Sequence, residues 1–535
     1  MKKYFLLLVL ALILASPLLV STLRSDGSML INGSGDNLWH LSLAVETQKQ
    51  IPPTFPGISG LPLKNYHYFS DLMWGVVSKI TNIAISTLYF QVGSLAVCLV
   101  LVFSVYKLAY YYSKKVSWSI VCVITTLFVG SASFVKPYFI KGSTWSGNNF
   151  MLDQPYDQLI NLHTGIGYIL ILLGTFFVFK WFKTSALKYS FFAALVFSFL
   201  FGIKIFFAIP MATAFGLICL VQVKETKFKS LLPALLLFAL SLLIYFTISD
   251  KVGFDHGSPI VLRPGWLITK MIEDPDRFNL EGYYLKQLHY ESKNNWLRLS
   301  QMGIEKVLMY IFGNFWIKLL GIFYLVKTFK KNQKENIFLS LCICISLVLP
   351  LIVTPQPEPF NTIQFGQVAT IFLGLLLGLF ASSSKRNTII LAFFTPIIIY
   401  SFYKDFFNPK KFSEYIIPKE EISALTYLKS NSNANAIVMV DPAFENKKMK
   451  VSALAERRTF YTGDNISWIF NIVDNNRSVI QTMFFSSEAD KVYTEKTIKD
   501  YSINYIYSSS PERFAEIGYP LIYSNPKVYI FKTTN

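Results

Sequence analysis

The sequence predicts a polytopic α-helical membrane protein with about eleven transmembrane helices, followed by a C-terminal extracytoplasmic α/β domain. Hydrophobic residues make up 53% of the 535 positions and charged residues only 15%, whereas a soluble domain carries about 25% charged residues. Apolar runs close to the roughly 20 residues that span a bilayer recur as far as residue 403. Beyond that point the apolar runs shorten to strand length, and Pro, Asn, Ser and charged residues become frequent.

The candidate spans are apolar segments bounded by polar or charged residues. We interpret the first as an uncleaved anchor rather than a signal peptide, because its apolar run is long for a signal sequence. Residues 189–221 are read as two short helices that turn near Lys204, since both flanks are basic. The eleven spans cover residues 4–23, 88–110, 117–135, 159–181, 189–203, 205–221, 231–248, 307–326, 337–353, 369–381 and 388–403.

The formal net charge is +18, and the distribution of the basic residues between the loops predicts the orientation of these spans. In a soluble protein such a charge would suggest nucleic acid, but here the basic residues flank apolar runs, so we expect a lipid bilayer as partner and no nucleic acid. The basic clusters between spans fall on the side of Lys2 and Lys3. The rule that cytoplasmic loops are basic therefore predicts a multi-pass protein of the cytoplasmic (inner) membrane, with a cytoplasmic N-terminus and an extracytoplasmic C-terminal domain.

This topology divides the chain into a transmembrane domain, residues 1–403, and an extracytoplasmic α/β domain, residues 404–535. One long helix across 189–221 would instead invert the predicted orientation of every later span and of the C-terminal domain. Three external loops of the first domain are unusually long, and long loops with their own aromatic and charged residues favour a site at the outer face. They cover residues 24–87, 136–158 and 250–306.

The tail shows the pattern of a small α/β domain. An amphipathic helix is predicted at 419–429 and a further helix at 467–483. Strands are predicted at 436–440, 503–507, 520–523 and 528–532, with a turn at 524–526 joining the last two. Arg457 and Arg458 could bind an anionic or sugar ligand, or form a surface ion cluster.

The first external loop holds the strongest candidate for chemistry. Asp36 precedes a predicted helix at 38–50, so its carboxylate could accept a proton from an attacking hydroxyl or amine, or could simply cap the helix. His40 lies in the same segment and is a candidate substrate contact. Aromatic, imidazole and acidic groups gather again at Tyr66, His67 and Asp71, either as substrate contacts or as interfacial anchors. If helical, His67 and Asp71 would share a face.

Other candidates lie in the remaining external segments and at their edges. Asp153 and Asp157 could hold a divalent cation such as Mg²⁺ or Mn²⁺, or be two solvated carboxylates. Lys204 lies within an apolar stretch, where a lysine either has a function or extends to the membrane surface. Substrate contacts are further predicted for His256 and Arg263, which suit a phosphate, and for Gln364, which could line a polar cavity.

No nucleotide-binding loop, serine elbow or zinc motif occurs, so transfer chemistry would need an already activated donor. With about eleven spans, a large first external loop, a long later loop and an external α/β tail, the chain resembles the GT-C superfamily of membrane glycosyltransferases. The resemblance implies a sugar donor carried on polyprenyl phosphate, a glycan, lipid or protein acceptor, and an early acid as base, the place that Asp36 occupies. Asn37 stands where many members have a second acid.

Under this resemblance, Lys204, His256 and Arg263 would hold the leaving phosphate, and attack at the anomeric carbon would invert it. Two other classes of protein remain open from the sequence. One is a transporter or flippase of lipid-linked glycans, which would use the same basic groups without chemistry. The other is a non-enzymatic assembly protein of the cell envelope.

Overall fold

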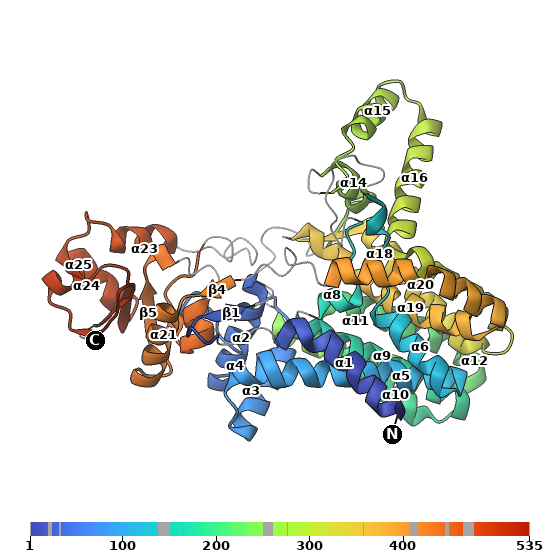
Figure 1. Ribbon diagram of the computed structural model, residues 1–535, viewed down its shortest axis with the longest axis horizontal. Coiled ribbons are helices and arrows are strands. Elements are labelled where there is room, and N and C mark those ends of the chain that lie inside the picture. The colour runs from blue at the N-terminus through green and yellow to red at the C-terminus, as the bar shows by residue number, and fades with distance from the viewer. Residues whose placement is uncertain are drawn as a thin grey trace. The chain divides into compact units, whose positions relative to one another are not determined.

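A computed structural model describes two compact units of the chain (Figure 1). The helical unit comprises Met1–Leu14, Val97–Thr247 and Phe254–Lys411, and the mixed unit comprises Ala15–Ala96, Ile248–Gly253 and Phe412–Asn535. The residues that the structure describes are 2–19, 24–31, 34–136, 150–159, 161–249, 260–274, 277–356, 358–406, 415–444, 449–463 and 476–533.

The apolar segments are helical, as predicted. Among the described residues, seven helices are long and apolar enough to cross a membrane: Ile85–Ser113, Leu162–Thr184, Leu231–Ile248, Trp296–Thr328, Gln333–Ile352, Pro359–Ser382 and Lys385–Lys404. Four apolar helices are shorter: Lys3–Pro17, Val116–Leu127, Leu187–Ile203 and Ile205–Val221. Each of the eleven predicted segments overlaps one of these helices, but the segment predicted at 117–135 is an α-helix only as far as Leu127. The break predicted near Lys204 is confirmed, because α10 (Leu187–Ile203) and α11 (Ile205–Val221) meet at this one extended residue.

The helical unit is built around α19 (Ile363–Ser382), which is almost entirely buried. Small residues let its neighbours approach closely, as is usual between membrane helices. A Cβ at Gly374 would lie 2.6 Å from the Cα of Thr126, and one at Gly378 would lie 2.6 Å from the Cα of Cys122. The helices that pack on α19 include α6 (Val116–Leu127), α11, α17 (Gly321–Thr328), α18 (Gln333–Ile352) and α20 (Lys385–Phe406).

The mixed unit contains a five-stranded sheet in the order β6-β5-β7-β9-β8. Its strands are β5 (Ile437–Val440), β6 (Arg458–Thr459), β7 (Tyr505–Ser508), β8 (Leu521–Ser524) and β9 (Tyr529–Lys532). β5 pairs in parallel with β6 and β7, while β9 runs antiparallel to β7 and β8. Four of these strands were predicted, and the turn between β8 and β9 is confirmed at Asn525, whose Oδ1 accepts from the N–H of Val528.

Among the described residues of the tail, four α-helices accompany the sheet: α21 (Lys419–Asn431), α23 (Arg477–Phe485), α24 (Lys491–Asp500) and α25 (Glu512–Ile517). The first confirms the amphipathic helix predicted at 419–429. Of the helix predicted at 467–483, only the part from residue 476 lies within the described residues. A short antiparallel pair, β1 (Met29–Ile31) with β4 (Tyr415–Ile417), was not predicted.

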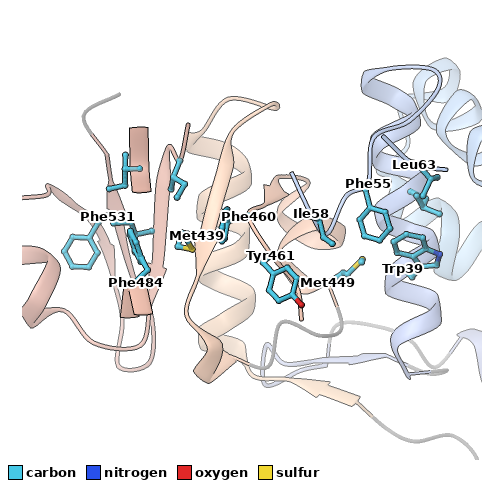
Figure 2. Close-up of a cluster of buried hydrophobic side chains, with 14 of the residues drawn as sticks. Trp39, Phe55, Ile58, Leu63, Met439, Met449, Phe460, Tyr461, Phe484 and Phe531 are labelled. Atoms are coloured by element: carbon cyan, nitrogen blue, oxygen red, sulfur yellow. The ribbon is translucent and has the colours of Figure 1, made fainter. Parts of the chain in front are cut away.

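The first predicted external loop packs on the tail through one hydrophobic core (Figure 2). Trp39 belongs to α2 (Ser34–Lys49), and the segment that follows α2 adds Phe55, Ile58 and Leu63. These side chains form one cluster with residues from the sheet and helices of the tail, including Met439, Met449, Phe460, Tyr461, Phe484 and Phe531. Residues 34–81 and the tail therefore fold as one body, whereas the boundary between residues 403 and 404 stays a prediction.

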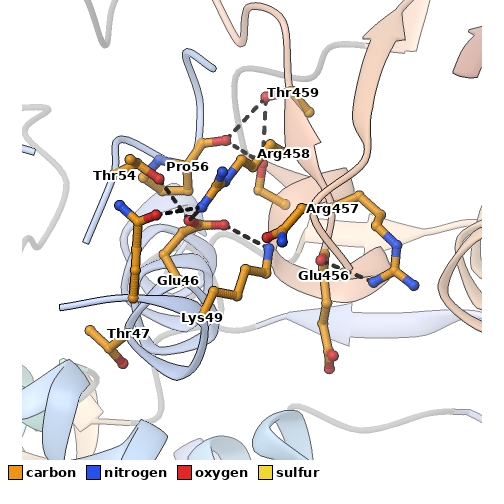
Figure 3. A network of polar contacts seen from close by, with 12 residues as sticks. Glu46, Thr47, Lys49, Thr54, Pro56, Glu456, Arg457, Arg458 and Thr459 are labelled. Carbon is orange, nitrogen blue, oxygen red and sulfur yellow. Dashed lines mark hydrogen bonds and ion pairs between the residues drawn. The ribbon is translucent and has the colours of Figure 1, made fainter. Parts of the chain in front are cut away.

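A buried ion network fastens α2 to β6 (Figure 3). The Glu46 carboxylate accepts hydrogen bonds from Lys49 at 2.6 Å, Thr54 at 2.8 Å and Arg458 Nε at 3.0 Å. Burial raises the pKa of Glu46, but the charges and hydrogen bonds of Lys49 and Arg458 outweigh burial and hold it below its ordinary value of 4.5. Arg457 is also buried and donates to backbone oxygens of the tail, so this arginine pair stabilises the fold.

Candidate functional site

Asp36 lies in the first turn of α2 and is exposed. The helix begins at Ser34, earlier than predicted, so Asp36 is a first-turn residue rather than the residue before the helix. A carboxylate in this position is stabilised by the positive end of the helix dipole. His40 follows four residues later on the same face of α2. The exposed acid thus stands one helical turn from a buried imidazole.

His40 pairs with Asp71 of α3 (Phe69–Thr81), and both side chains are buried. The imidazole Nδ1 lies 3.0 Å from Oδ1 and 3.2 Å from Oδ2 of the carboxylate. Burial raises the pKa of Asp71, while the neighbouring His40 opposes that rise by its charge and hydrogen bond. The carboxylate fixes which imidazole nitrogen carries the proton, because only Nδ1–H can donate to it.

Tyr66 completes a chain of three polar side chains. Its hydroxyl lies 3.3 Å from His40 Nε2, which accepts from the hydroxyl when Nδ1–H donates to Asp71. Burial, followed by the negative charges of Asp71 and Asp36, raises the pKa of Tyr66 well above its ordinary value. Tyr66 therefore stays a protonated phenol, and Asp36 is close enough for its charge to act on this ring.

His67 is placed differently from the sequence expectation. It stacks on Tyr66, with ring centroids 4.7 Å apart, and does not share a helix face with Asp71. The expected arrangement was wrong because α3 begins only at Phe69. His67 thus supports the Tyr66 ring rather than the carboxylate.

Gly75 allows α3 to approach α2 closely enough for the His40–Asp71 pair. A Cβ at this position would lie 2.4 Å from Thr47 Oγ1 and 2.8 Å from the carbonyl oxygen of Ala44. The threonine hydroxyl donates to that same carbonyl at 2.8 Å, so it has no freedom to move away. A side chain at residue 75 would force the two helices apart.

Lys204 forms a second polar group, within the helical unit. Its side chain is buried, and Nζ donates to Thr164 Oγ1 at 2.7 Å and lies 3.3 Å from His163 Nε2. The ammonium group also lies 5.4 Å from the centre of the Phe207 ring. Thr164 and His163 belong to the first turn of α9 (Leu162–Thr184), and neither was predicted to accompany the lysine. A buried cation with polar neighbours is chemically suited to an anionic group.

Gln154, in the predicted second external loop, is hydrogen-bonded to two buried residues of the helical segment Trp296–Thr328. Lys318 is fully buried and donates to Gln154 Oε1 at 2.8 Å, and Gln154 donates to the carbonyl of Asn314 at 3.2 Å. Sequence reasoning missed Lys318, although the signal that identified Lys204, a lysine inside an apolar run, applies to it equally.

The two carboxylates predicted to hold a cation make local contacts. Asp153 accepts from Gln158 Nε2 at 2.6 Å, and Asp157 accepts from the backbone N–H of Gln154 at the start of α8 (Pro155–Gln158). Within the described ranges, no group of three or more His, Cys, Asp or Glu side chains is arranged to hold a metal ion. The pair alone supplies two carboxylates, fewer ligands than Mg²⁺ or Mn²⁺ takes.

The remaining predicted residues lie in the segments around β2 (Ile260–Leu262) and the start of α19. Arg263 is exposed, and its backbone N–H donates to the carbonyl of Ile352 at 2.9 Å. Gln364, the predicted cavity residue, donates to Asn361 Oδ1 at 2.7 Å. His256 lies outside the described residues. The structure thus gathers His40, Tyr66 and Asp71 beside Asp36, and places Lys204 in a group of its own.

No protein-family model matches the chain, and the search of curated proteins also finds no match. Among solved structures, the chain is similar to the oligosaccharyltransferase of Archaeoglobus fulgidus. The apo form gives a TM-score of 0.49 at 12% identity, covering 95% of this chain and 69% of that one. The complex with an inhibitory peptide and a dolichol-phosphate gives 0.48 at 13% identity, with 95% and 69% covered.

A third structure of the same enzyme, with Zn and sulfate, also gives a TM-score of 0.48 at 13% identity, covering 94% of this chain and 68% of that one. TM-scores below 0.5 at 12–13% identity are too low to assign the chain to that family.

Proposed function

We propose that the protein is a membrane glycosyltransferase that moves a sugar from a polyprenyl-phosphate-linked donor to an acceptor at the outer face of the cytoplasmic membrane. The observation that carries the proposal is the arrangement at the start of α2. There an exposed carboxylate, Asp36, stands one turn from the buried His40–Asp71 pair. Within the part of the chain that the structure describes, seven helices are long and apolar enough to cross a bilayer, which suits a lipid-linked donor.

Asp36 acts as the general base in this proposal. It removes the proton from an acceptor hydroxyl or amine as that group attacks the anomeric carbon of the donor sugar. The new bond forms between the acceptor atom and the anomeric carbon, and the bond from that carbon to the phosphate oxygen breaks. The leaving polyprenyl phosphate takes the electron pair, the proton goes to Asp36, and the anomeric configuration inverts. Exposure suits Asp36 to this role better than the buried Asp71.

The chain Asp71–His40–Tyr66 positions groups around Asp36. Tyr66 stays protonated and donates its one O–H proton to His40 Nε2, so its oxygen can accept a hydrogen bond from a hydroxyl of the sugar or acceptor. A phenol held in this way can orient a sugar or acceptor oxygen next to the base. Tyr66, His40 and Asp71 are therefore assigned to substrate positioning rather than to proton transfer.

Stabilisation of the leaving phosphate is assigned to Lys204. A phosphate leaves readily once its developing charge is neutralised by a cation in surroundings that exclude water. Lys204 is a buried cation, and Thr164 and His163 can add hydrogen bonds to an oxyanion. Arg263 and His256 are proposed as further phosphate contacts, and Asp153 with Asp157 as contacts for a divalent cation.

The test uses the full chain in lipid nanodiscs supplied with polyprenyl-phosphate sugars and candidate acceptors, with products identified by mass spectrometry. We expect Asp36→Asn to lower the transfer rate by at least about 100-fold, the usual contribution of a positioned general base. The matched control is Asp500→Asn, which removes an exposed carboxylate at the end of α24. Transfer by Asp36→Asn at the wild-type rate would refute the role of Asp36.

A parallel assay separates the other two classes of protein. The chain is placed in vesicles containing a fluorescent polyprenyl-phosphate sugar, and movement of the sugar between leaflets is followed by chemical reduction of the exposed probe. Movement without any glycosylated product would replace the proposal with a flippase. Neither movement nor product, across mono- and diphosphate donors, would favour a non-enzymatic envelope protein.

A further inference from the structure

The helices α15 (Glu281–Ser292) and α16 (Trp296–Phe315) form a hairpin that projects from the helical unit together with α14 (Trp266–Glu273) (Figure 1). Large apolar side chains cover its outer surface. Leu297 is 82% exposed, Trp296 71% and Leu285 63%. Further exposed apolar residues on the two helices are Tyr284, Leu288, Ile304, Leu308 and Phe312. Single exposed apolar residues are ordinary, but a continuous apolar surface marks a contact with another phase or molecule.

Two hydrogen bonds between polar side chains join the two helices of the hairpin. Lys306 is buried and donates to Gln287 Oε1 at 2.8 Å, and it lies 3.9 Å from Glu273 of α14. Tyr283 of α15 also donates to Glu305 of α16. A hairpin surrounded by water would place its apolar residues between the helices. This hairpin places hydrogen-bonded polar groups there and leucine, isoleucine and phenylalanine outside, which is the arrangement expected next to lipid.

The apolar surface is continuous with a candidate span. Trp296–Thr328 is a helical segment of 33 residues that contains an apolar window long enough to cross a bilayer. It is divided into α16, a 3-10 turn at Trp316–Leu320 and α17, and it is longer than the roughly 20 residues that one crossing needs. On α16 the exposed residues Leu297, Ile304, Leu308 and Phe312 recur at helical spacing along one face. The end that extends beyond one crossing thus continues the apolar face of the span.

Basic groups accompany this face. Lys286, Lys293 and Arg298 are exposed on the hairpin or in its turn. Trp296 stands at the turn itself, and tryptophan favours the boundary between headgroups and acyl chains. A helix pair with an apolar face, an aromatic tip and flanking basic residues has the composition of an interfacial membrane anchor.

We propose that the α15–α16 hairpin inserts its apolar face into the headgroup boundary of the bilayer, with its basic residues on the phosphates of anionic lipids. The hairpin therefore contacts the membrane surface, although most of it lies in the segment 250–306, which the sequence predicts to be an external loop. This inference does not depend on glycosyl transfer.

The test measures how deeply a nitroxide spin label at the hairpin enters lipid. Leu297→Cys is labelled in a Cys344→Ser background, because the other four cysteines are buried. The protein is placed in nanodiscs with and without an anionic phospholipid, and collisions with oxygen and with a water-soluble nickel chelate are compared. Phe393→Cys, 75% exposed on α20, gives the lipid reference, and Val492→Cys, 72% exposed on α24, gives the water reference.

We expect the label at residue 297 to show an oxygen-to-nickel collision ratio several-fold above that at residue 492 and to approach that at residue 393. Replacing Lys286, Lys293 and Arg298 by Gln should lower the ratio at residue 297 in anionic nanodiscs and leave it unchanged in zwitterionic ones. A ratio at residue 297 equal to that at residue 492 in both lipids would overturn the proposal. So would dipolar broadening between labels of two copies, which would make the face a dimer contact.

Discussion

His40 Nδ1 lies 3.0 Å from Asp71 Oδ1, and neither side chain is more than 3% exposed. The two residues belong to separate helices and are 31 positions apart. Their pairing leaves His40 Nε2 directed at the Tyr66 hydroxyl, 3.3 Å away. The negative charge of Asp36 also acts on Tyr66 and raises the pKa of its hydroxyl. Through Tyr66, the buried pair is therefore connected to the exposed start of α2.

Asp71→Asn should change how stability depends on pH. Burial raises the pKa of Asp71 in the folded state, so the folded protein binds the proton more tightly than the unfolded chain. The stabilisation that Asp71 contributes is therefore fully present below its ordinary pKa of 3.8 and is lost as pH rises through the raised folded value. Each unit of upward shift corresponds to about 1.4 kcal/mol.

The measurement is thermal unfolding, followed by circular dichroism, at a series of pH values from below 3.8 to neutral pH. Relative to wild type, Asp71→Asn should gain stability as pH rises above 3.8. Asp500→Asn, at an exposed carboxylate, should show no such trend. A difference between wild type and Asp71→Asn that stays constant with pH would show that burial of the carboxyl group is not the dominant effect.

Glu46→Gln should destabilise the mixed unit strongly. The change leaves the partly buried Lys49 and Arg458 without their shared, buried carboxylate, and breaking a buried ion pair costs about 3–5 kcal/mol. Since the folded pKa of Glu46 is depressed, its contribution is present above pH 4.5 and falls as pH drops through the folded value. Denaturant unfolding at neutral pH measures the loss.

The control for this change is Glu495→Gln, which breaks the exposed pair with Lys491. Exposed pairs contribute about 1 kcal/mol or less. Equal losses for the two variants would mean that the Glu46 network is no stronger than a surface ion pair.

The positions of the apolar helices could be predicted because length and hydropathy decide them locally. The break near Lys204 could also be predicted, since basic residues at both flanks of residues 189–221 favour two crossings over one. The strands of the tail followed from short apolar runs between turn residues. In each case the signal lies within the segment that folds.

The pairing of residues across elements could not be predicted in the same way. Local spacing suggested His67 as the helical neighbour of Asp71, but the start of α3 at Phe69 and the close approach at Gly75 select His40 instead. The contact between Glu46 and Arg458 spans 412 positions, and no periodicity within either segment reveals it. Such contacts depend on how elements pack.

Gly75→Ala tests whether close packing of α2 and α3 creates the candidate site. The added methyl group would overlap Thr47 Oγ1 and the carbonyl of Ala44, so the helices must separate. We expect a loss of about 1–3 kcal/mol in unfolding free energy, together with reduced glycosyl transfer. Gly303→Ala in α16, where a Cβ meets no atom within 4 Å, is the control and should be neutral or slightly stabilising. Unchanged stability and transfer in Gly75→Ala would show that the helices can separate without disturbing the site.

Lys204→Gln should weaken binding of the phosphate-bearing donor. The substitution removes the buried positive charge beside Thr164 and His163 while keeping a side chain that can hydrogen-bond. A charge-assisted hydrogen bond contributes about 1.5–3 kcal/mol, and about 1.4 kcal/mol corresponds to tenfold in Kd. A polyprenyl monophosphate titrated into the protein in nanodiscs should therefore bind at least about tenfold more weakly. Lys188→Gln, at an exposed lysine near the start of α10, should bind it as wild type does. Because both variants lose one positive charge, equal weakening by the two would assign the effect to the general field of the basic chain, and unchanged binding by Lys204→Gln would remove this lysine from the phosphate site.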